Sequence, residues 1–188
     1  METKDFLNLV LPQGDMYYIL SGKAKLRSAT SKTIDGLSSL IDSANQRREN
    51  VYVGLAAYKA GASREGQNVT AKQCLYVDMD CGPSKDYADK SDALSALKAF
   101  LSATKFPVPT IIVDSGNGIH AYWVTKEVMI PSEWTSMATG LKQLLASTKT
   151  AHDTSVIADI TRTLRVPGSF NYKDAVPKAC TEIGRAHV

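Results

Sequence analysis

Hydrophobic and polar positions alternate with a period of two near the middle of the chain. Within residues 74–80, one face of an extended segment would carry Leu75, Val77 and Met79, and the other face would carry Tyr76, Asp78 and Asp80. A Gly82-Pro83 pair follows and stops the segment. The pattern predicts a β-strand that presents two carboxylates on the same face.

Helical and extended patterns alternate along the rest of the chain. Apolar runs at 17–20 and 51–55 predict strands, with a helix between them marked by Leu37, Leu40, Ile41 and Ala44. Residues 60–73 are polar and glycine-rich, which predicts a loop. Beyond residue 80 the pattern predicts a helix capped by Ser91 or Asp92, strands at 110–113 and 119–124, a helix beginning at Pro131, and a last strand within 165–173.

This order of elements predicts an α+β fold in two units. An N-terminal α/β unit is expected over about residues 1–70, and a ferredoxin-like (RRM-like) unit over about 71–181, with helices on one face of its sheet. A chain of 188 residues can bury enough apolar surface to fold without disulfides or a structural metal.

Composition excludes several classes of protein. No segment approaches the roughly 20 apolar residues of a membrane span, and the first twenty residues lack the pattern of a signal peptide. The three cysteines form no Cys-x-x-Cys pair, so neither a disulfide framework nor a zinc site is expected. These features favour a cytoplasmic protein with no membrane partner. The net charge of +3 is too small to indicate nucleic-acid binding by itself.

The last seven residues, 182–188, resemble the translation of a sequencing adapter. On this interpretation the natural protein would continue past about Thr181, and His187 would belong to no site.

The acidic pair Asp78 and Asp80 is the first chemical signal. Two carboxylates on one face of a strand raise each other's pKa unless a cation neutralises them, and their oxygens suit Mg²⁺ or Mn²⁺. A solvated acidic strand end would show the same pattern, so the pair alone leaves both interpretations open.

The second signal is the glycine-rich turn at 115–118 and the histidine that follows it. Gly116 and Gly118 would let backbone amides approach a phosphate, with Ser115 and Asn117 beside them. His120 would point to the same side as Tyr122 and could donate to a triphosphate oxygen. An ordinary hairpin followed by a surface histidine is the alternative.

The third signal is an acid followed by clustered bases over residues 153–173. Arg162 and Arg165 would share a face of a helical turn and grip phosphates, and Lys173 would add a mobile charge. A carboxylate for metals together with cations for phosphates is what nucleotidyl transfer needs. A salt-bridged helix end could explain this element alone, but not all three signals in one short chain.

In combination, the three signals resemble the archaeo-eukaryotic primase (AEP) superfamily. Residues 75–82 look like its acidic motif, and residues 115–123 are similar to its Ser-x-His element in the form found in primase-polymerases of phages and plasmids. Residues 153–173, with Arg-x-x-Arg-x-Pro-Gly, look like its third motif. The resemblance covers about residues 50–175.

The resemblance implies an α/β unit beside an RRM-like unit, with the active site in the cleft between them. It implies that two divalent ions, Mg²⁺ or Mn²⁺, are held by Asp78, Asp80 and Asp153, with no zinc. The triphosphate would be bound by the turn at 115–118 and by His120, Arg162, Arg165 and Lys173. Asp159 remains an alternative third acid, or would orient Arg162 or the turn from outside the ligand set.

The resulting hypothesis is a template-directed primase and polymerase of a phage, plasmid or other mobile element in a bacterial or archaeal cell. Its expected partners are single-stranded DNA, dNTPs or NTPs, and a C-terminal or separate helicase. The template groove is expected to use Arg47, Arg48, Lys59, Arg64 and Lys72. The rival interpretations are a catalytically silent module that binds single strands or nucleotides, and a metal-dependent nuclease.

Overall fold

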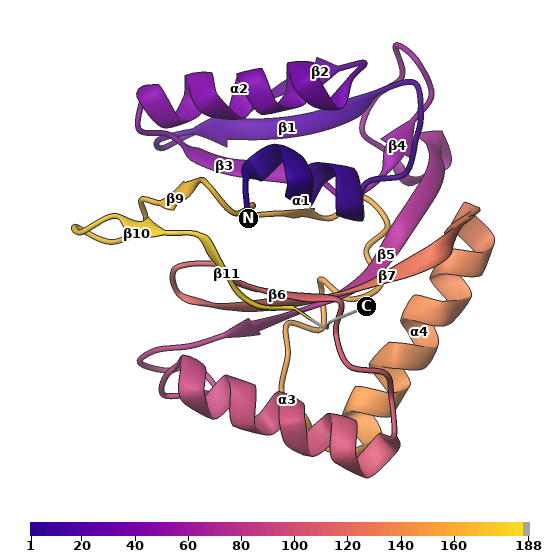
Figure 1. Ribbon diagram of the computed structural model, residues 1–188, viewed down its shortest axis with the longest axis vertical. Coiled ribbons are helices and arrows are strands. Elements are labelled where there is room, and N and C mark those ends of the chain that lie inside the picture. The colour runs from indigo at the N-terminus through magenta and orange to yellow at the C-terminus, as the bar shows by residue number, and fades with distance from the viewer. Residues whose placement is uncertain (186–188) are drawn as a thin grey trace.

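Two β-sheets form the framework of the computed structural model, which describes residues 1–185 (Figure 1). The first sheet has the strand order β2-β1-β3-β8, and all its pairings are antiparallel. Its strands are β1 (Tyr17–Gly22), β2 (Arg27–Ser31), β3 (Asn50–Gly54) and β8 (Thr163–Leu164). The last of these comes from the far end of the chain, so this sheet is not built by the N-terminal region alone.

The second sheet has the order β11-β6-β7-β5-β4. Its strands are β4 (Ala57–Tyr58), β5 (Val69–Asp80), β6 (Ile111–Asp114), β7 (Gly118–Met129) and β11 (Thr181–Arg185). The long strands β5 and β7 pair in a register that sets Asp78 opposite His120. A separate hairpin joins β9 (Phe170–Asn171) to β10 (Lys178–Ala179).

Within residues 1–185, four α-helices pack against these sheets. They are α1 (Thr3–Val10), α2 (Ile34–Gln46), α3 (Lys90–Thr104) and α4 (Pro131–Ser147); a short 3₁₀ turn, η1, covers Gly66–Asn68. In Figure 1, α2 lies on the outer side of the first sheet, and α3 and α4 flank the second sheet on the side away from α2. The N-cap of α3 is Asp89, which accepts from the amides of Ser91 and Asp92, so the predicted cap was wrong by two or three positions.

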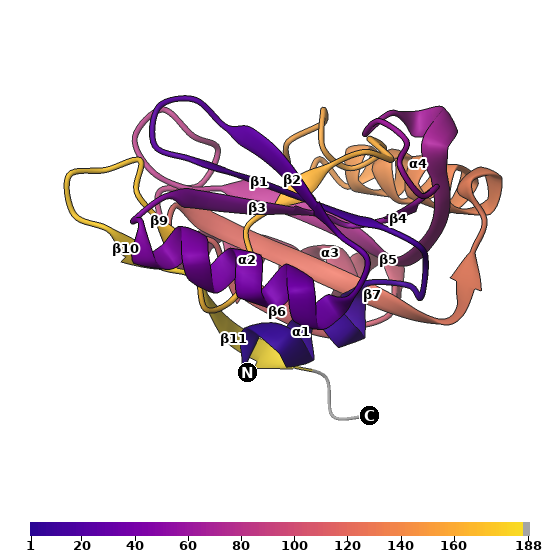
Figure 2. The same cartoon turned by 90° about the horizontal axis from the view of Figure 1, so that it is seen from above.

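A continuous hydrophobic core joins the two sheets. Helix α1 contributes Phe6, whose ring meets Tyr122 of β7 edge-on at a centroid distance of 5.3 Å. The view from above shows α1 and α2 side by side over the strands (Figure 2). Because both sheets contribute to one core, the facing sides of β3 and β5 are held at a fixed separation, which is what a site between them requires.

Two of the predicted elements were wrong. The expected last strand at 165–173 does not join the second sheet, because Thr163–Leu164 pairs with the open edge of β3 and the following residues enter the β9–β10 hairpin. The fifth strand of the second sheet is instead β11, at the edge beside β6. The predicted loop at 60–73 ends early, since β5 already begins at Val69.

The structure describes the C-terminal segment as far as Arg185. Residues 181–185 pair with β6, whereas residues 186–188, including His187 of the expected adapter-derived tail, lie outside the described part of the chain. Within residues 1–185, the helices are too short or too polar to cross a lipid bilayer.

Candidate active site

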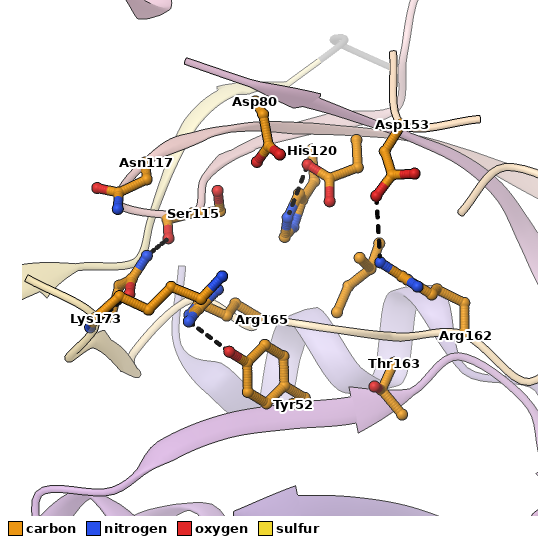
Figure 3. A pocket seen from close by; sticks show the side chains of 13 residues that line it. Tyr52, Asp80, Ser115, Asn117, His120, Asp153, Arg162, Thr163, Arg165 and Lys173 are labelled. Carbon is orange, nitrogen blue, oxygen red and sulfur yellow. Dashed lines mark hydrogen bonds and ion pairs between the residues drawn. The ribbon is translucent and has the colours of Figure 1, made fainter. Parts of the chain in front are cut away.

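A polar pocket of about 130 Å³ lies between the two sheets (Figure 3). The pocket is lined by Tyr52, Asp78, Asp80, Ser115, Asn117, His120, Asp153, Arg162, Thr163, Leu164, Arg165, Asn171 and Lys173. Nine of these thirteen residues were predicted as site residues from the sequence. The three separate sequence signals therefore meet in one place. Gly116 and Gly118 of the prediction do not line the pocket.

Asp78 and Asp80 project into the pocket from the end of β5, as the period-two pattern predicted. Burial, reinforced by the charge of Asp80, raises the pKa of Asp78 from 3.8 to about 7. Its Oδ1 atom is buried and accepts no hydrogen bond from any residue between 1 and 185. A buried carboxylate oxygen with no donor is unfavourable unless a proton or a cation occupies the site.

Asp153 is held beside Asp78 by the backbone. The amide of Asp153 donates to the carbonyl oxygen of Asp78 at 2.9 Å. Burial works to raise the pKa of Asp153, but hydrogen bonds from Ser155 and the charges of Arg162 and Lys85 outweigh it and lower the pKa. Asp159 does not line the pocket: its Oδ1 accepts from the amide and hydroxyl of Thr161. Geometry thus places Asp153, and not Asp159, with the acidic pair.

His120 is buried rather than on the surface, with a side-chain exposure of 4%. Its Nδ1 atom lies 3.1 Å from the Tyr122 hydroxyl, and its Nε2 atom lies 3.6 Å from Asp78 Oδ1. Burial and the nearby Arg165 lower the pKa of His120 to about 3. The ring is therefore neutral at ordinary pH, and the 3.6 Å approach is not a charged ion pair.

The turn at 115–118 contributes Ser115 and Asn117 to the pocket, and two of its backbone amides are engaged within the protein. The Ser115 amide donates to the Gly118 carbonyl, and the Gly116 amide donates to Asp114 Oδ1, so both are already used inside the protein. Gly116 has φ +92°, and a Cβ there would lie 2.6 Å from Cβ of Asn171. Glycine is needed at this position for backbone conformation and for close packing, and the predicted phosphate-binding nest is not formed by these two amides.

Arg162 and Arg165 flank strand β8 instead of sharing a helical turn, so that detail of the prediction was wrong. Arg165 is buried; its Nη2 donates to Asn50 Oδ1 at 3.0 Å and to the Tyr52 hydroxyl at 2.6 Å. Its guanidinium carbon also lies 4.5 Å from the centre of the Tyr52 ring. The Nη2 atom of Arg162 lies 3.6 Å from Asp153 Oδ2.

The carboxylates that line the pocket are the donors available there to a divalent cation. Among the described residues, no three His, Cys, Asp or Glu side chains are gathered closely enough to form a ready ligand group. Asp80 is paired with Lys85 at 2.7 Å, and Asp153 accepts from Ser155. The unpartnered Oδ1 of Asp78 and the hard carboxylate oxygens nevertheless fit Mg²⁺ or Mn²⁺, provided that Asp80 and Asp153 exchange their present partners for the ion.

Four lining residues were missed by sequence reasoning: Tyr52, Thr163, Leu164 and Asn171. A signal existed for Tyr52, because Val51 and Val53 alternate with it and are fully buried on the opposite face of β3. Asn171 lies in the third motif; its Nδ2 donates to the Ser115 carbonyl at 3.1 Å and so joins the third motif to the second.

Two of the five bases expected in a template groove are engaged inside the protein. Lys72 is fully buried, which contradicts its assignment to a surface groove. Arg64 donates to the Thr161 carbonyl at 2.7 Å. Arg47, Arg48 and Lys59 are exposed.

Comparison with known proteins gives sequence and fold relationships. No family model matches the chain. A replication protein of Clostridium perfringens is 29% identical over 126 residues, which are 66% of this chain; the chain spans only 30% of that protein's length. The AEP domain of the cyanophage S-2L primase-polymerase superimposes with a TM-score of 0.71 at 15% identity, covering 98% of this chain and 89% of that domain.

The polymerase domain of Mycobacterium tuberculosis ligase D, solved in complex with DNA, is similar with a TM-score of 0.51 at 16% identity, over 87% of this chain and 62% of that one. Both structural neighbours are polymerase domains by name, and the expected α+β architecture is confirmed. The resemblance seen in the motifs therefore extends to the tertiary structure: the chain has the fold of the archaeo-eukaryotic primase superfamily.

Proposed function

We propose that the chain is the catalytic core of a DNA primase-polymerase that joins nucleotides on a single-stranded DNA template, in the replication of a phage, plasmid or other mobile element. The observation that carries this proposal is the distribution of charge in the pocket. Asp80 and Asp153 lie on one side, and Arg162, Arg165 and Lys173 approach from the other (Figure 3). A cation–phosphate site facing carboxylates is suited to nucleotidyl transfer.

The reaction forms a bond between the 3′ oxygen of the primer and the α-phosphorus of a dNTP or NTP. The bond from the α-phosphorus to the oxygen that bridges it to the β-phosphorus breaks, pyrophosphate leaves, and the hydroxyl proton passes to solvent. Asp78, Asp80 and Asp153 would hold two divalent ions, which supply activation of the hydroxyl and neutralisation of the leaving group. No protein side chain is assigned as a general base.

The basic side chains would bind the triphosphate. Arg165 is oriented for this by the hydrogen bonds from its Nη2 to Asn50 and Tyr52. Its Nε, which donates to no residue between 1 and 185, would give a charge-assisted hydrogen bond to a phosphate oxygen. Ser115 and Asn117 would add neutral donors from the turn. His120 would contribute a hydrogen bond without charge, since its pKa is lowered to about 3.

The size of the pocket favours binding of the phosphate end of the substrate. A volume of about 130 Å³ is well below the roughly 300–1,000 Å³ of pockets that enclose a whole small molecule. The triphosphate and its ions would occupy this space, and the sugar and base would extend outward to the template. Arg47, Arg48 and Lys59 remain as exposed bases for the template, and a helicase is the proposed partner in a longer protein or complex.

Primer extension with Mn²⁺ tests the proposal. The double variant Asp78→Ala, Asp80→Ala should fold and give no extended product, while Asp42→Ala, an exposed acid on α2, should extend as the wild type does. Undiminished extension by the double variant would eliminate the metal assignment. Labelled single strands in the same assay separate the alternatives: shortened products would indicate a nuclease, and unchanged strands a silent binding module.

A further inference from the structure

An unusual set of hydrogen bonds holds residues 159–162, which lie just before Thr163 and belong to no helix or strand. Four consecutive carbonyl oxygens each accept from a donor elsewhere in the chain. The bonds are Tyr76 hydroxyl to Asp159 (2.7 Å), Lys72 Nζ to Ile160 (3.3 Å), Arg64 Nη1 to Thr161 (2.7 Å) and Leu55 amide to Arg162 (3.2 Å). These bonds take the place of the regular ladder that a helix or strand would supply.

Lys72 is the least expected of these donors. Its side chain is fully buried, and no salt bridge among the described residues involves it. The Nζ atom lies 4.3 Å from the centre of the Trp134 ring and 4.8 Å from that of Tyr76, and it donates to the Tyr76 hydroxyl at 3.2 Å. Burial lowers the pKa of Lys72 to about 7. The amine keeps N–H donors whether or not it is protonated, so the bond to Ile160 does not depend on its charge.

Tyr76 is linked to Arg162 of the pocket through one shared hydrogen-bond acceptor, the carbonyl oxygen of Asp159. The Asp159 carbonyl that accepts from the Tyr76 hydroxyl also accepts from the Arg162 amide at 3.1 Å. Tyr76 itself is fully buried and does not line the pocket. It lies two residues before Asp78 on β5, on the same face of the strand. One strand therefore carries the acids and also anchors the segment that carries the arginines.

We propose that Lys72 and Tyr76 are positioning residues that fix the distance between the acids of β5 and the arginines that follow residue 159. This proposal rests on the proposed function in one respect, namely that the arginines bind a triphosphate. Neither side chain touches the pocket, so their effect must pass through the Asp159 and Ile160 carbonyls. A site that binds a cation and a triphosphate together needs this distance held, because small misplacements weaken such binding strongly.

Two substitutions separate positioning from simple stabilisation. Lys72→Met keeps the apolar bulk but removes the donor to the Ile160 carbonyl. The cost of that lost hydrogen bond is offset because a buried amine no longer has to be desolvated. Tyr76→Phe removes only the hydroxyl. The matched controls are Tyr17→Phe, which loses a similar buried bond to the Pro12 carbonyl far from the segment, and Lys98→Met on exposed α3.

The first measurement is hydrogen exchange, which does not depend on activity. We expect faster exchange of the Arg162 and Leu55 amides in Lys72→Met and Tyr76→Phe, with the amides of 74–80 unchanged, and no change of either set in the controls. The second is calorimetric titration with a nonhydrolysable dNTP and Mg²⁺. Its dissociation constant should rise about tenfold in both variants, at a melting temperature near that of the wild type for Lys72→Met.

The outcomes distinguish this proposal from the proposed function. Unchanged exchange at Arg162 in both variants would overturn the positioning role. Faster exchange with unchanged nucleotide affinity would also overturn it, because the segment would then move without consequence for the site. If the wild type bound no triphosphate, the proposed function would fail, while the exchange result would still decide whether Lys72 and Tyr76 hold the segment.

Discussion

The backbone amide of Asp153 donates a hydrogen bond of 2.9 Å to the carbonyl oxygen of Asp78. This bond joins two acids that are 75 positions apart in the sequence, and it does so through the main chain. The bond leaves both carboxylates available for other contacts, and that of Asp153 accepts from Ser155.

Asp78 should destabilise the metal-free protein at neutral and alkaline pH. Its pKa is raised from 3.8 to about 7, so between about pH 4 and 7 the folded state binds more protons than the unfolded state. Stability then falls as the pH rises through this range and stays low above it. Asp78→Asn should increase the free energy of unfolding at pH 8 by on the order of 4 kcal/mol, with the gain vanishing near pH 4.

Urea denaturation at a series of pH values, with EDTA present, measures this effect. Asp42→Asn on the exposed face of α2 is the control and should follow the wild type at every pH. A gain for Asp78→Asn that stayed constant from pH 4 to pH 8 would contradict the raised pKa as its cause.

Lys85 competes with a cation for Asp80. The ammonium lies 2.7 Å from Asp80 Oδ2, and half of the Lys85 side chain is exposed, so the pair contributes little to stability. Lys85→Met should strengthen Mn²⁺ binding by at most about fivefold, because ion pairs between exposed side chains are weak. Electron paramagnetic resonance titration of free Mn²⁺ provides the affinity.

Lys90 offers the matched control for this substitution. It pairs with Asp114 at 2.6 Å, and neither residue lines the pocket. Lys90→Met should leave Mn²⁺ affinity unchanged. Equal strengthening by both variants would mean a general charge effect and not release of Asp80.

Substitution of Arg165 should weaken nucleotide binding and leave template binding nearly unchanged. Arg165→Lys keeps the charge but loses the planar guanidinium whose Nη2 donates to both Asn50 and Tyr52. We expect about a tenfold loss of dNTP affinity, equivalent to roughly 1.4 kcal/mol, and little change in single-stranded DNA binding measured by fluorescence anisotropy. Arg27→Lys, at an exposed position of β2 outside the pocket, is the control. The reverse selectivity would assign Arg165 to the template.

His120 should remain neutral across the working pH range. Burial and Arg165 lower the pKa of His120 to about 3 in the folded protein. Below about pH 6.5 the unfolded chain therefore binds a proton at this residue that the folded protein does not, and the free energy of unfolding falls as the pH falls. The ring proton resonance of His120, assigned by comparison with His120→Gln, should not move between pH 8 and pH 4.5. In 8 M urea the same resonance should titrate near pH 6.5. A midpoint near 6 in the folded protein would refute the neutral assignment.

Local pattern was enough to predict much of the site. The period of two in 74–80 placed Asp78 and Asp80 together on one face, and the same alternation put His120 beside Tyr122. These features depend on strand geometry alone, which repeats every two residues whatever the strand pairs with. The helix beginning at Pro131 was predicted from its first-turn proline and helical spacing, and the strand at 51–55 from a short apolar run; these signals are local as well.

Only the tertiary structure decided which residues line the pocket and which lie outside it. Lys72 is a residue type that usually lies on the surface, but here it is buried against Trp134. The Asp159 carboxylate accepts a hydrogen bond from Thr161, whereas Asp153 lies beside Asp78. The sequence by itself determined the order and spacing of the acidic and basic motifs. The pairing of β8 with β3, the burial of Lys72 and the contact of Tyr52 with Arg165 depend on segments far apart in the chain, and no local period encodes them.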